Sequence, residues 1–160
     1  MASNLDFKIS TGMQNHLMAT DDFASGVNGG LIKIYGSTTS QAAADALIPA
    51  TANAAIGSAT LLCTVSVSGG GTGLHMDTTP SSGVLTKASA ESWYGTNVAS
   101  GYASFYRFAP IADDGTLSTT AKRCQGTVGI LGTNLIVASA YLTLGEQQRI
   151  DSYAVGVPSE

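Results

Sequence analysis

The sequence predicts a mainly β protein, an antiparallel β-sandwich or jelly-roll-like fold with one N-terminal α-helix. The strongest observation is the stretch 58–68, where apolar side chains at odd positions from Leu61 to Val67 alternate with hydroxyl side chains at Thr64, Ser66 and Ser68. This alternation gives a strand one apolar and one polar face. Similar short segments follow, with turn signals about every 8 to 14 residues, which is typical of a sandwich or barrel. No helical pattern alternates with them, which argues against a parallel α/β fold.

The N-terminal part carries the one helix that the sequence pattern favours. Residues 10–23 repeat apolar side chains at helical spacing, and Ser10 or Thr11 can cap the first turn. Residues 1–9 precede this helix and lack a regular pattern. We therefore expect them to form a flexible arm.

The remainder of the chain divides into short strands and loops. Residues 37–57 are rich in small side chains and predict a long loop with one helical turn at 41–47. A loop of this length in a compact domain is often an interaction element. Residues 88–97 predict a connection that carries an aromatic side chain into the core. The other segments expected to be extended are 31–35, 74–77, 84–87, 98–109, 123–130, 134–140 and 148–157, with 141–145 leading to the last of them.

Composition limits the function classes. The chain has 160 residues, enough for one domain with its own core, and we expect the arm and helix in residues 1–27 and the sandwich in residues 30–158. Only 11% of the residues are charged, against about 25% in a typical globular protein. This deficit fits strands covered by hydroxyl groups, and it also fits a surface that is buried in an assembly, because interface cores are depleted in charge.

Charge and hydropathy argue against two kinds of partner. The net charge is −4 and only seven residues are basic, which is too few for a surface that follows nucleic-acid phosphates. No uninterrupted apolar run approaches the roughly 20 residues that a membrane-spanning helix needs. The N-terminal residues lack the basic start and apolar centre of a signal peptide, so we expect synthesis in the cytoplasm.

No catalytic, cofactor or metal motif is found. The glycine run at 69–73 lacks the third glycine of a dinucleotide fingerprint and the Gly-Lys-Ser/Thr of a phosphate loop, and predicts a hairpin turn. His75 and Asp77 fall on one strand face, but no Gly-x-Ser-x-Gly segment supplies a nucleophile. We therefore expect a protein that is not an enzyme and binds neither cofactor nor metal. The pairs Asp21-Asp22 and Asp113-Asp114 are expected to be solvated turn acids.

The sulfur and aromatic residues have structural interpretations. Cys63 and Cys124 lie on the apolar phase of predicted strands, which indicates two small buried side chains; a disulfide between facing sheets is the alternative. Trp93 and Tyr94, with Tyr102 and Tyr106, either form a sugar-binding platform or lie in the core or a subunit interface. Tyr102, Tyr106 and Phe108 are expected on one strand face.

Several segments resemble those of a family of small virion structural proteins from tailed bacteriophages. The segments are STGMQNHLMAT (10–20), GGLIKIYG (29–36), SATLLC (58–63), GVLTK (83–87) and GTVG (126–129). The resemblance covers nearly the whole chain and involves turns and strand edges, so no active-site residue carries over. It implies a decoration or cement protein on the outside of the capsid, with the phage major capsid protein as partner. Head–tail (neck) or tail placement is the alternative, and a virion-surface carbohydrate- or receptor-binding module is another.

A role of this kind predicts an interaction surface. A cement protein could use its low charge, the N-terminal arm and the exposed small-residue loop as a clamp across neighbouring subunits, and a homotrimer on a local threefold axis is the oligomer we expect. Many weak contacts of this kind add up over a shell. We expect location on the virion, outside the capsid, after synthesis in the bacterial host. The candidate residues are Leu5, Phe7, Ile9, Ala42, Ala43, Leu47, Trp93 and Tyr94.

Overall fold

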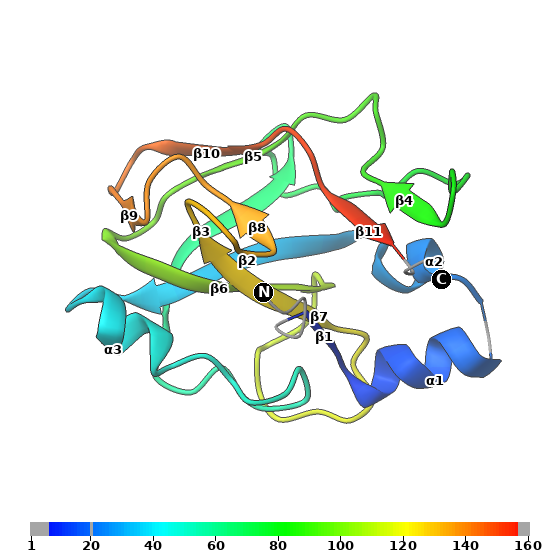
Figure 1. Cartoon of the computed structure of the whole chain (residues 1–160), viewed down its shortest axis with the longest axis horizontal. Helices are drawn as coiled ribbons and strands as arrows, with labels where there is room; N and C mark the ends of the chain where they lie inside the picture. Colours follow the sequence, from blue (N-terminus) through cyan, green and yellow to red (C-terminus); the bar gives the residue numbers. More distant parts are fainter. Residues whose placement is uncertain (1–6, 20, 157–160) are drawn as a thin grey trace.

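The computed structural model describes residues 7–19 and 21–156 of the protein. It confirms the mainly β, antiparallel fold class: one sheet of nine strands and one of two strands accompany three short helices in these ranges. Figure 1 shows the arrangement. The helices are α1 (Thr11–Ala19), α2 (Phe23–Val27) and α3 (Gln41–Asp45). The strands are β1 (Lys8–Ile9), β2 (Gly30–Ser37), β3 (Thr60–Val67), β4 (Val84–Thr86), β5 (Trp93–Thr96), β6 (Gly101–Pro110), β7 (Cys124–Gly129), β8 (Leu135–Ile136), β9 (Tyr141–Leu142), β10 (Gln147–Ile150) and β11 (Ala154–Gly156).

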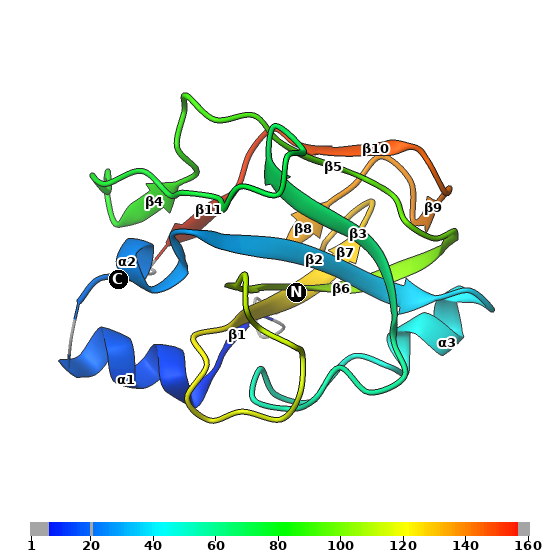
Figure 2. The ribbon, with the colours of Figure 1, turned by 180° about the vertical axis from the view of Figure 1, so that it is seen from behind.

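The large sheet curls over itself to form two layers. Its strand order is β1-β7-β6-β2-β3-β5-β10. Strand β3 pairs with β2 through residues 60–65 and then with β5 through residues 66–67. As a result β5 and β10 lie over β2, β6 and β7, as Figures 1 and 2 both show. The core fills the space between the layers, where the Trp93 ring meets the edge of Phe108 at a centroid distance of 6.0 Å.

Two bulges flank β2 and shift the alternation of both neighbouring strands. Leu62 is the extra residue between Cys63 and Leu61 of β3, and Ser104 is the extra residue of β6. A bulge moves the following side chains to the other face. The expected alternation of β3 therefore holds only from Cys63 onward, and Leu62 is fully buried in the core. The expectation of one aromatic face was also wrong, because Tyr102 lies before the bulge at Ser104 and turns away from Tyr106.

The outer face of the central strands is covered as well. The segments 46–59 and 111–122 run together beneath it, joined by hydrogen bonds from Ser118 N to Asn53 O and from Ile56 N to Gly115 O, both 2.9 Å. Helix α3 packs at one end, where Ser104 Oγ donates to Ala44 O at 2.9 Å. Figure 2 shows α3 and these loops on the side of β2 and β6 opposite β5. The helical turn expected at 41–47 is thus confirmed as α3.

The N-terminal prediction needs two corrections. The single helix expected over residues 10–23 is two helices, because the Asp22 side chain accepts from Ser25 N and starts α2 as a separate helix. Ser10 caps α1, accepting from Met13 N at 3.1 Å. Part of the expected flexible arm is a strand, since Lys8–Ile9 forms β1 and pairs with β7. Residues 1–6 lie outside the described residues.

The C-terminal half has shorter strands than the sequence suggests. Strand β7 ends at Gly129, so Ile130, the last residue of the segment expected to be extended, lies after the strand and is 61% exposed. Of the strand expected over 134–140 only β8 is formed, and it runs parallel to β7. The strand expected over 148–157 divides into β10 and β11, because the second piece leaves the large sheet to pair with β4.

Both cysteines are free and buried, as the simpler interpretation predicted. Cys63 and Cys124 belong to the same core cluster. Burial raises the pKa of Cys63 to about 12 and also raises the pKa of Cys124. Both side chains therefore act as small apolar residues at neutral pH. None of the helices in the described ranges is long and apolar enough to cross a membrane.

Candidate functional site

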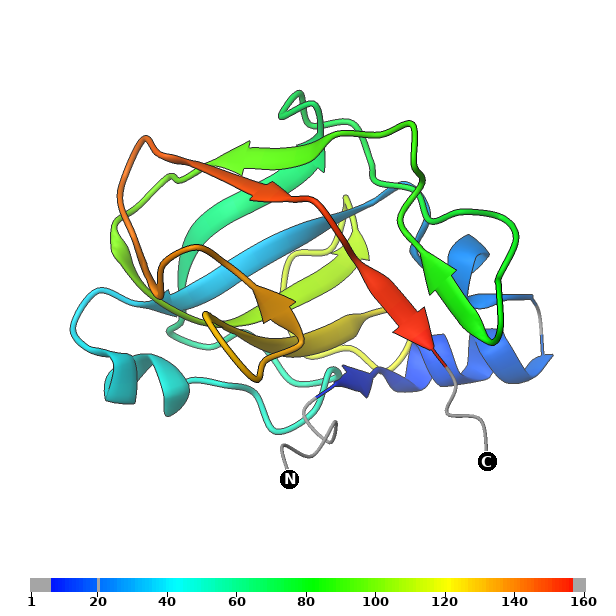
Figure 3. The ribbon, with the colours of Figure 1, turned by 45° about the horizontal axis from the view of Figure 1, so that its top comes forward.

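An apolar groove lies between the N-terminal elements and the small sheet. The pairing of β11 with β4 places Val155 opposite Leu85, and Figure 3 shows these two strands beside α1 and α2. The groove has a volume of about 440 Å³, within the range of natural binding pockets. Its lining is Phe7, Ile9, Leu17, Asp22, Phe23, Thr78, Pro80, Gly83, Leu85, Val155 and Gly156. We call these residues the apolar groove.

The chemistry of the groove favours contact with apolar groups. Among the described residues that line it, Asp22 and Thr78 carry the only polar side chains. Asp22 is already engaged, since it accepts from Ser25 N at 2.8 Å. This lining therefore offers neither a nucleophile paired with a base nor a set of metal ligands. It can hold aliphatic or aromatic side chains.

A second apolar feature is the turn after β7. Ile130 is 61% exposed, Leu131 is 85% exposed, and Ile136 on β8 is 63% exposed. We call these three residues the aliphatic tip. Its backbone is fixed from below: Val137 N donates to Gly129 O at 3.0 Å and Thr127 N donates to Asn134 Oδ1 at 3.0 Å. The tip is thus a turn with a fixed backbone that exposes three large apolar side chains. Single exposed apolar residues are common on protein surfaces, whereas a group of them marks a contact site.

A row of polar side chains, two of them buried, crosses the outer face of the central sheet. Lys33, Arg107 and Gln125 lie opposite one another on β2, β6 and β7. Arg107 Nη2 donates to Gln125 Oε1 at 2.7 Å, and Lys33 Nζ donates to Asp113 O at 3.1 Å. Burial, helped by the charge of Arg123, lowers the pKa of Arg107 to about 10. The row attaches the covering loops to the sheet, because Gln125 Nε2 donates to Pro49 O at 2.8 Å.

The same face holds a buried ion pair that the sequence did not predict. Arg123 Nε donates to Asp113 Oδ2 at 2.7 Å, and its Nη2 contacts the other carboxylate oxygen. The exposed fractions of the two side chains are 1% and 5%. Asp113 is therefore not the solvated turn acid that was expected. The neighbouring Asp114 is exposed, and hydrogen bonds from the Thr116 backbone and side chain lower its pKa.

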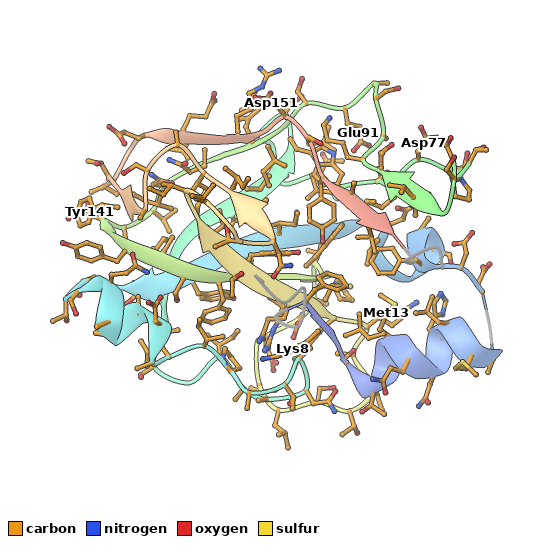
Figure 4. The ribbon with its side chains drawn as sticks, viewed as in Figure 1. Lys8, Met13, Asp77, Glu91, Tyr141 and Asp151 are labelled. Atoms are coloured by element: carbon orange, nitrogen blue, oxygen red, sulfur yellow. The ribbon has the colours of Figure 1, made fainter. Side chains whose placement is uncertain are left out.

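His75 has a carboxylate partner, but it is Glu91 rather than Asp77. Glu91 Oε1 lies 2.7 Å from His75 Nδ1, while Oε2 accepts from His75 N at 3.0 Å and from Trp93 Nε1 at 2.7 Å. Burial alone would raise the pKa of Glu91, but these hydrogen bonds outweigh it and hold the pKa below its ordinary value. Figure 4 labels both acids along the upper edge of the molecule, with Asp77 nearer β4.

This histidine pair lacks the third group that acid–base hydrolysis needs. Among residues 7–19 and 21–156, no serine or threonine hydroxyl is hydrogen-bonded to His75. A hydrolytic triad requires a nucleophile beside the base. The same ranges contain no group of three or more His, Cys, Asp or Glu side chains placed to hold a metal ion. Glu91 instead joins the segment that contains His75, between β3 and β4, to Trp93 of β5.

The candidate interaction residues do not form one surface. Phe7 and Ile9 lie together in the apolar groove, whereas Leu5 is outside the described residues. Ala42 is exposed and Ala43 half-buried on α3, and Leu47, in the turn after that helix, is half-buried. Helix α3 lies at the opposite end of the molecule from α1 and α2 in Figures 1 and 2.

Trp93 must be removed from the candidate surface, and with it the aromatic platform. Its side chain has no exposed area and packs against Phe108 and Tyr153. The one hydrogen-bond donor of this ring, Nε1, has a partner inside the protein, because it donates to Glu91 Oε2. Tyr94, on the other face of β5, is half-buried with its ring against Gly69.

Sequence reasoning missed most of the residues that matter at the two apolar surfaces. Leu85 and Val155 meet only because distant segments pair. The signal for the aliphatic tip was present, because Ile130, Leu131 and Gly132 combine large side chains with a turn glycine whose φ is 67°. Comparisons with protein-family models, curated proteins and solved structures found no match. The surfaces described above therefore supply the indications of function.

Proposed function

We propose that this chain is a non-enzymatic structural protein of a tailed-phage virion, acting as a decoration or cement protein on the outer capsid surface. The observation that carries the proposal is the presence of two separate apolar surfaces, the apolar groove and the aliphatic tip, on a chain with only 11% charged residues. Interface cores are depleted in charge and enriched in apolar groups. Such a surface is suited to contact with other protein subunits.

The proposed role is to stabilise the expanded state of the capsid by binding to that state alone. A protein that binds only the expanded capsid stabilises that state by mass action. Because many copies bind the same lattice, a modest free energy per copy becomes a large total. The partners are the phage major capsid protein and further copies of this chain. The protein is made in the bacterial host and ends on the exterior of the virion.

The fold supports a passive role of this kind. The polar row at Arg107 and the ion pair of Arg123 with Asp113 fasten the loops 46–59 and 111–122 to the sheet. Loops attached in this way present a fixed surface, which reduces the entropy lost on binding. The burial of Trp93 counts against the carbohydrate-binding alternative, since it removes the ring expected to stack on a sugar.

Quantitative mass spectrometry of purified virions tests this function. Hundreds of copies per particle, together with binding to expanded but not to unexpanded heads lacking the protein, would support the proposal. Six or twelve copies would instead indicate a ring at the neck or in the tail. Absence from purified particles would overturn it.

A further inference from the structure

We propose that a small monovalent anion of the size of chloride binds beside Arg107, on the outer face of the central sheet and beneath the loops 46–59 and 111–122. This binding site is separate from the apolar groove and the aliphatic tip, and it does not depend on the proposed function. Two observations carry it. One is a buried guanidinium with unused hydrogen-bond donors, and the other is an excess of positive charge around that group.

Arg107 has donors that no described residue uses. The residue is 2% exposed, and Nη2 donates to Gln125 Oε1 at 2.7 Å. Nε and Nη1 are both buried, and neither has an acceptor among residues 7–19 and 21–156. Buried polar groups in proteins almost always have a hydrogen-bond partner. These two nitrogens therefore require a bound acceptor.

Arg107 also lacks a partner of opposite charge. No ion pair of the described residues includes it, and Asp113 is already bound to Arg123 through both carboxylate oxygens. Burial lowers the pKa of Arg107 to about 10, so the guanidinium is still protonated at neutral pH. A buried charge is costly unless it is paired. A water molecule would accept from Nε or Nη1 but would leave the charge uncompensated, whereas an anion does both.

The surroundings of Arg107 add further positive charge. Lys33 of β2 and Gln125 of β7 lie directly opposite Arg107, one on each side. Lys8 of β1, labelled in Figure 4, lies opposite Gln125. Residues paired in this way share a face of the sheet, and Arg123, two residues before Gln125, lies on the same face. Four of the seven basic residues of the chain thus gather here, around the single carboxylate of the buried ion pair.

The covering loops determine the class of anion. Gln125 Nε2 donates to Pro49 O at 2.8 Å and fixes the first loop, and Lys33 Nζ donates to Asp113 O at 3.1 Å and fixes the second. A carboxylate or phosphate attached to another macromolecule would have to displace these loops. A free halide ion requires no such displacement, and its single charge matches the one guanidinium without an ion pair. Chloride is therefore the ligand that we assign.

The first experiment measures equilibrium unfolding of the full chain while chloride replaces gluconate at constant ionic strength. A ligand that binds only the folded state stabilises that state by mass action. Above the dissociation constant, the unfolding constant should fall about tenfold for each tenfold rise in chloride concentration. Gluconate is too large for the covered site and should give no such dependence, whereas bromide should act as chloride does.

Matched variants assign the effect to Arg107. Arg107→Met removes the charge, and an apolar replacement of a buried charge is often tolerated. Arg149→Met is the control, since it removes a guanidinium from a side chain that is 61% exposed. We expect the first variant to lose the chloride dependence and the second to keep it, with circular dichroism establishing that both are folded. If Arg107→Met does not fold, Arg107→Lys takes its place and should weaken chloride binding about tenfold or more, the effect of losing a hydrogen bond to a charged group.

A second experiment locates the ion directly. Crystals of the full chain soaked in bromide should show an anomalous difference peak in contact with Arg107 Nε or Nη1. A water molecule at that position without a bromide signal would overturn the inference, as would a carboxylate from residues 1–6 or 157–160. Equal unfolding constants in chloride and gluconate, or equal losses of chloride dependence in Arg107→Met and Arg149→Met, would also overturn it. A bromide peak without chloride-dependent unfolding would mean binding at crystal concentration only and would count against the site.

Discussion

Replacing Asp113 by asparagine tests the buried ion pair that attaches the covering loops to the sheet. The Asp113→Asn change would keep the shape of the side chain and the acceptor for Gly115 N, now 3.0 Å away. It would leave the Arg123 guanidinium, whose side chain is 1% exposed, without its counter-charge. Removing one partner of a buried pair costs about 3–5 kcal/mol, a large part of the roughly 5–15 kcal/mol that stabilises a domain.

The assay is equilibrium unfolding in urea followed by tryptophan fluorescence, which reports on the single buried Trp93. We expect the free energy of unfolding to fall by about 3–5 kcal/mol, and the melting temperature by roughly 6–20 °C for a domain of this size. Asp114→Asn is the matched control: it makes the same change of charge at the exposed neighbouring acid and should leave the unfolding midpoint unchanged. A loss below about 1 kcal/mol for Asp113→Asn, or equal losses for both variants, would refute the reasoning.

Three further predictions concern close packing and titration. Gly36→Ala places a Cβ 1.8 Å from Tyr102 O and should cost about 3 kcal/mol or more. Gly70→Ala places a Cβ in ordinary contact with Val67 O, at 3.7 Å, and should change stability by less than about 0.5 kcal/mol; chemical denaturation compares the two variants. Because burial raises the pKa of Cys63, the stabilisation linked to the buried thiols is complete below the ordinary pKa of 9.0 and is lost as pH rises toward about 12. The melting temperature should therefore fall over this pH range. Cys63 and Cys124 should also resist thiol reagents until the protein unfolds. The lowered pKa of Glu91 implies stabilisation that is present above 4.5 and lost as pH falls below it; Glu91→Gln should flatten this acid decline, and an unchanged pH profile would contradict it.

The strands were predictable because alternation of side chains is a local property of the sequence. The pattern of alternation fails at the bulges, where one extra residue moves every following side chain of the strand to the opposite face of the sheet. The three consecutive apolar residues Leu61, Leu62 and Cys63 were the only sign of the bulge in β3. The bulge at Ser104 left no such sign, since small and aromatic residues there fit either face.

The candidate surface was less predictable than the fold. Phe7 and Ile9 were selected as apolar residues of the segment 1–9, which was expected to be an arm that contacts neighbouring subunits. Their groove depends on the pairing of β11 with β4, which joins segments about seventy residues apart and has no local signal. Asp113 was misjudged for the same reason: the Asp-Asp-Gly sequence does predict a turn, but only the folded chain brings Arg123 against its carboxylate.

Strand β2 is covered on both faces and paired along both edges. Its amide hydrogens are therefore shielded from solvent by β3 and β6 at its edges, by the core on one face and by the covering loops on the other. Opening of β2 requires that β3, β6, the core and the outer loops all be disturbed, which corresponds to global unfolding. In a native-state hydrogen–deuterium exchange experiment, the amides of β2 should consequently be the last to acquire deuterium. The amides of β10, the last strand in the order of the large sheet, should exchange long before them.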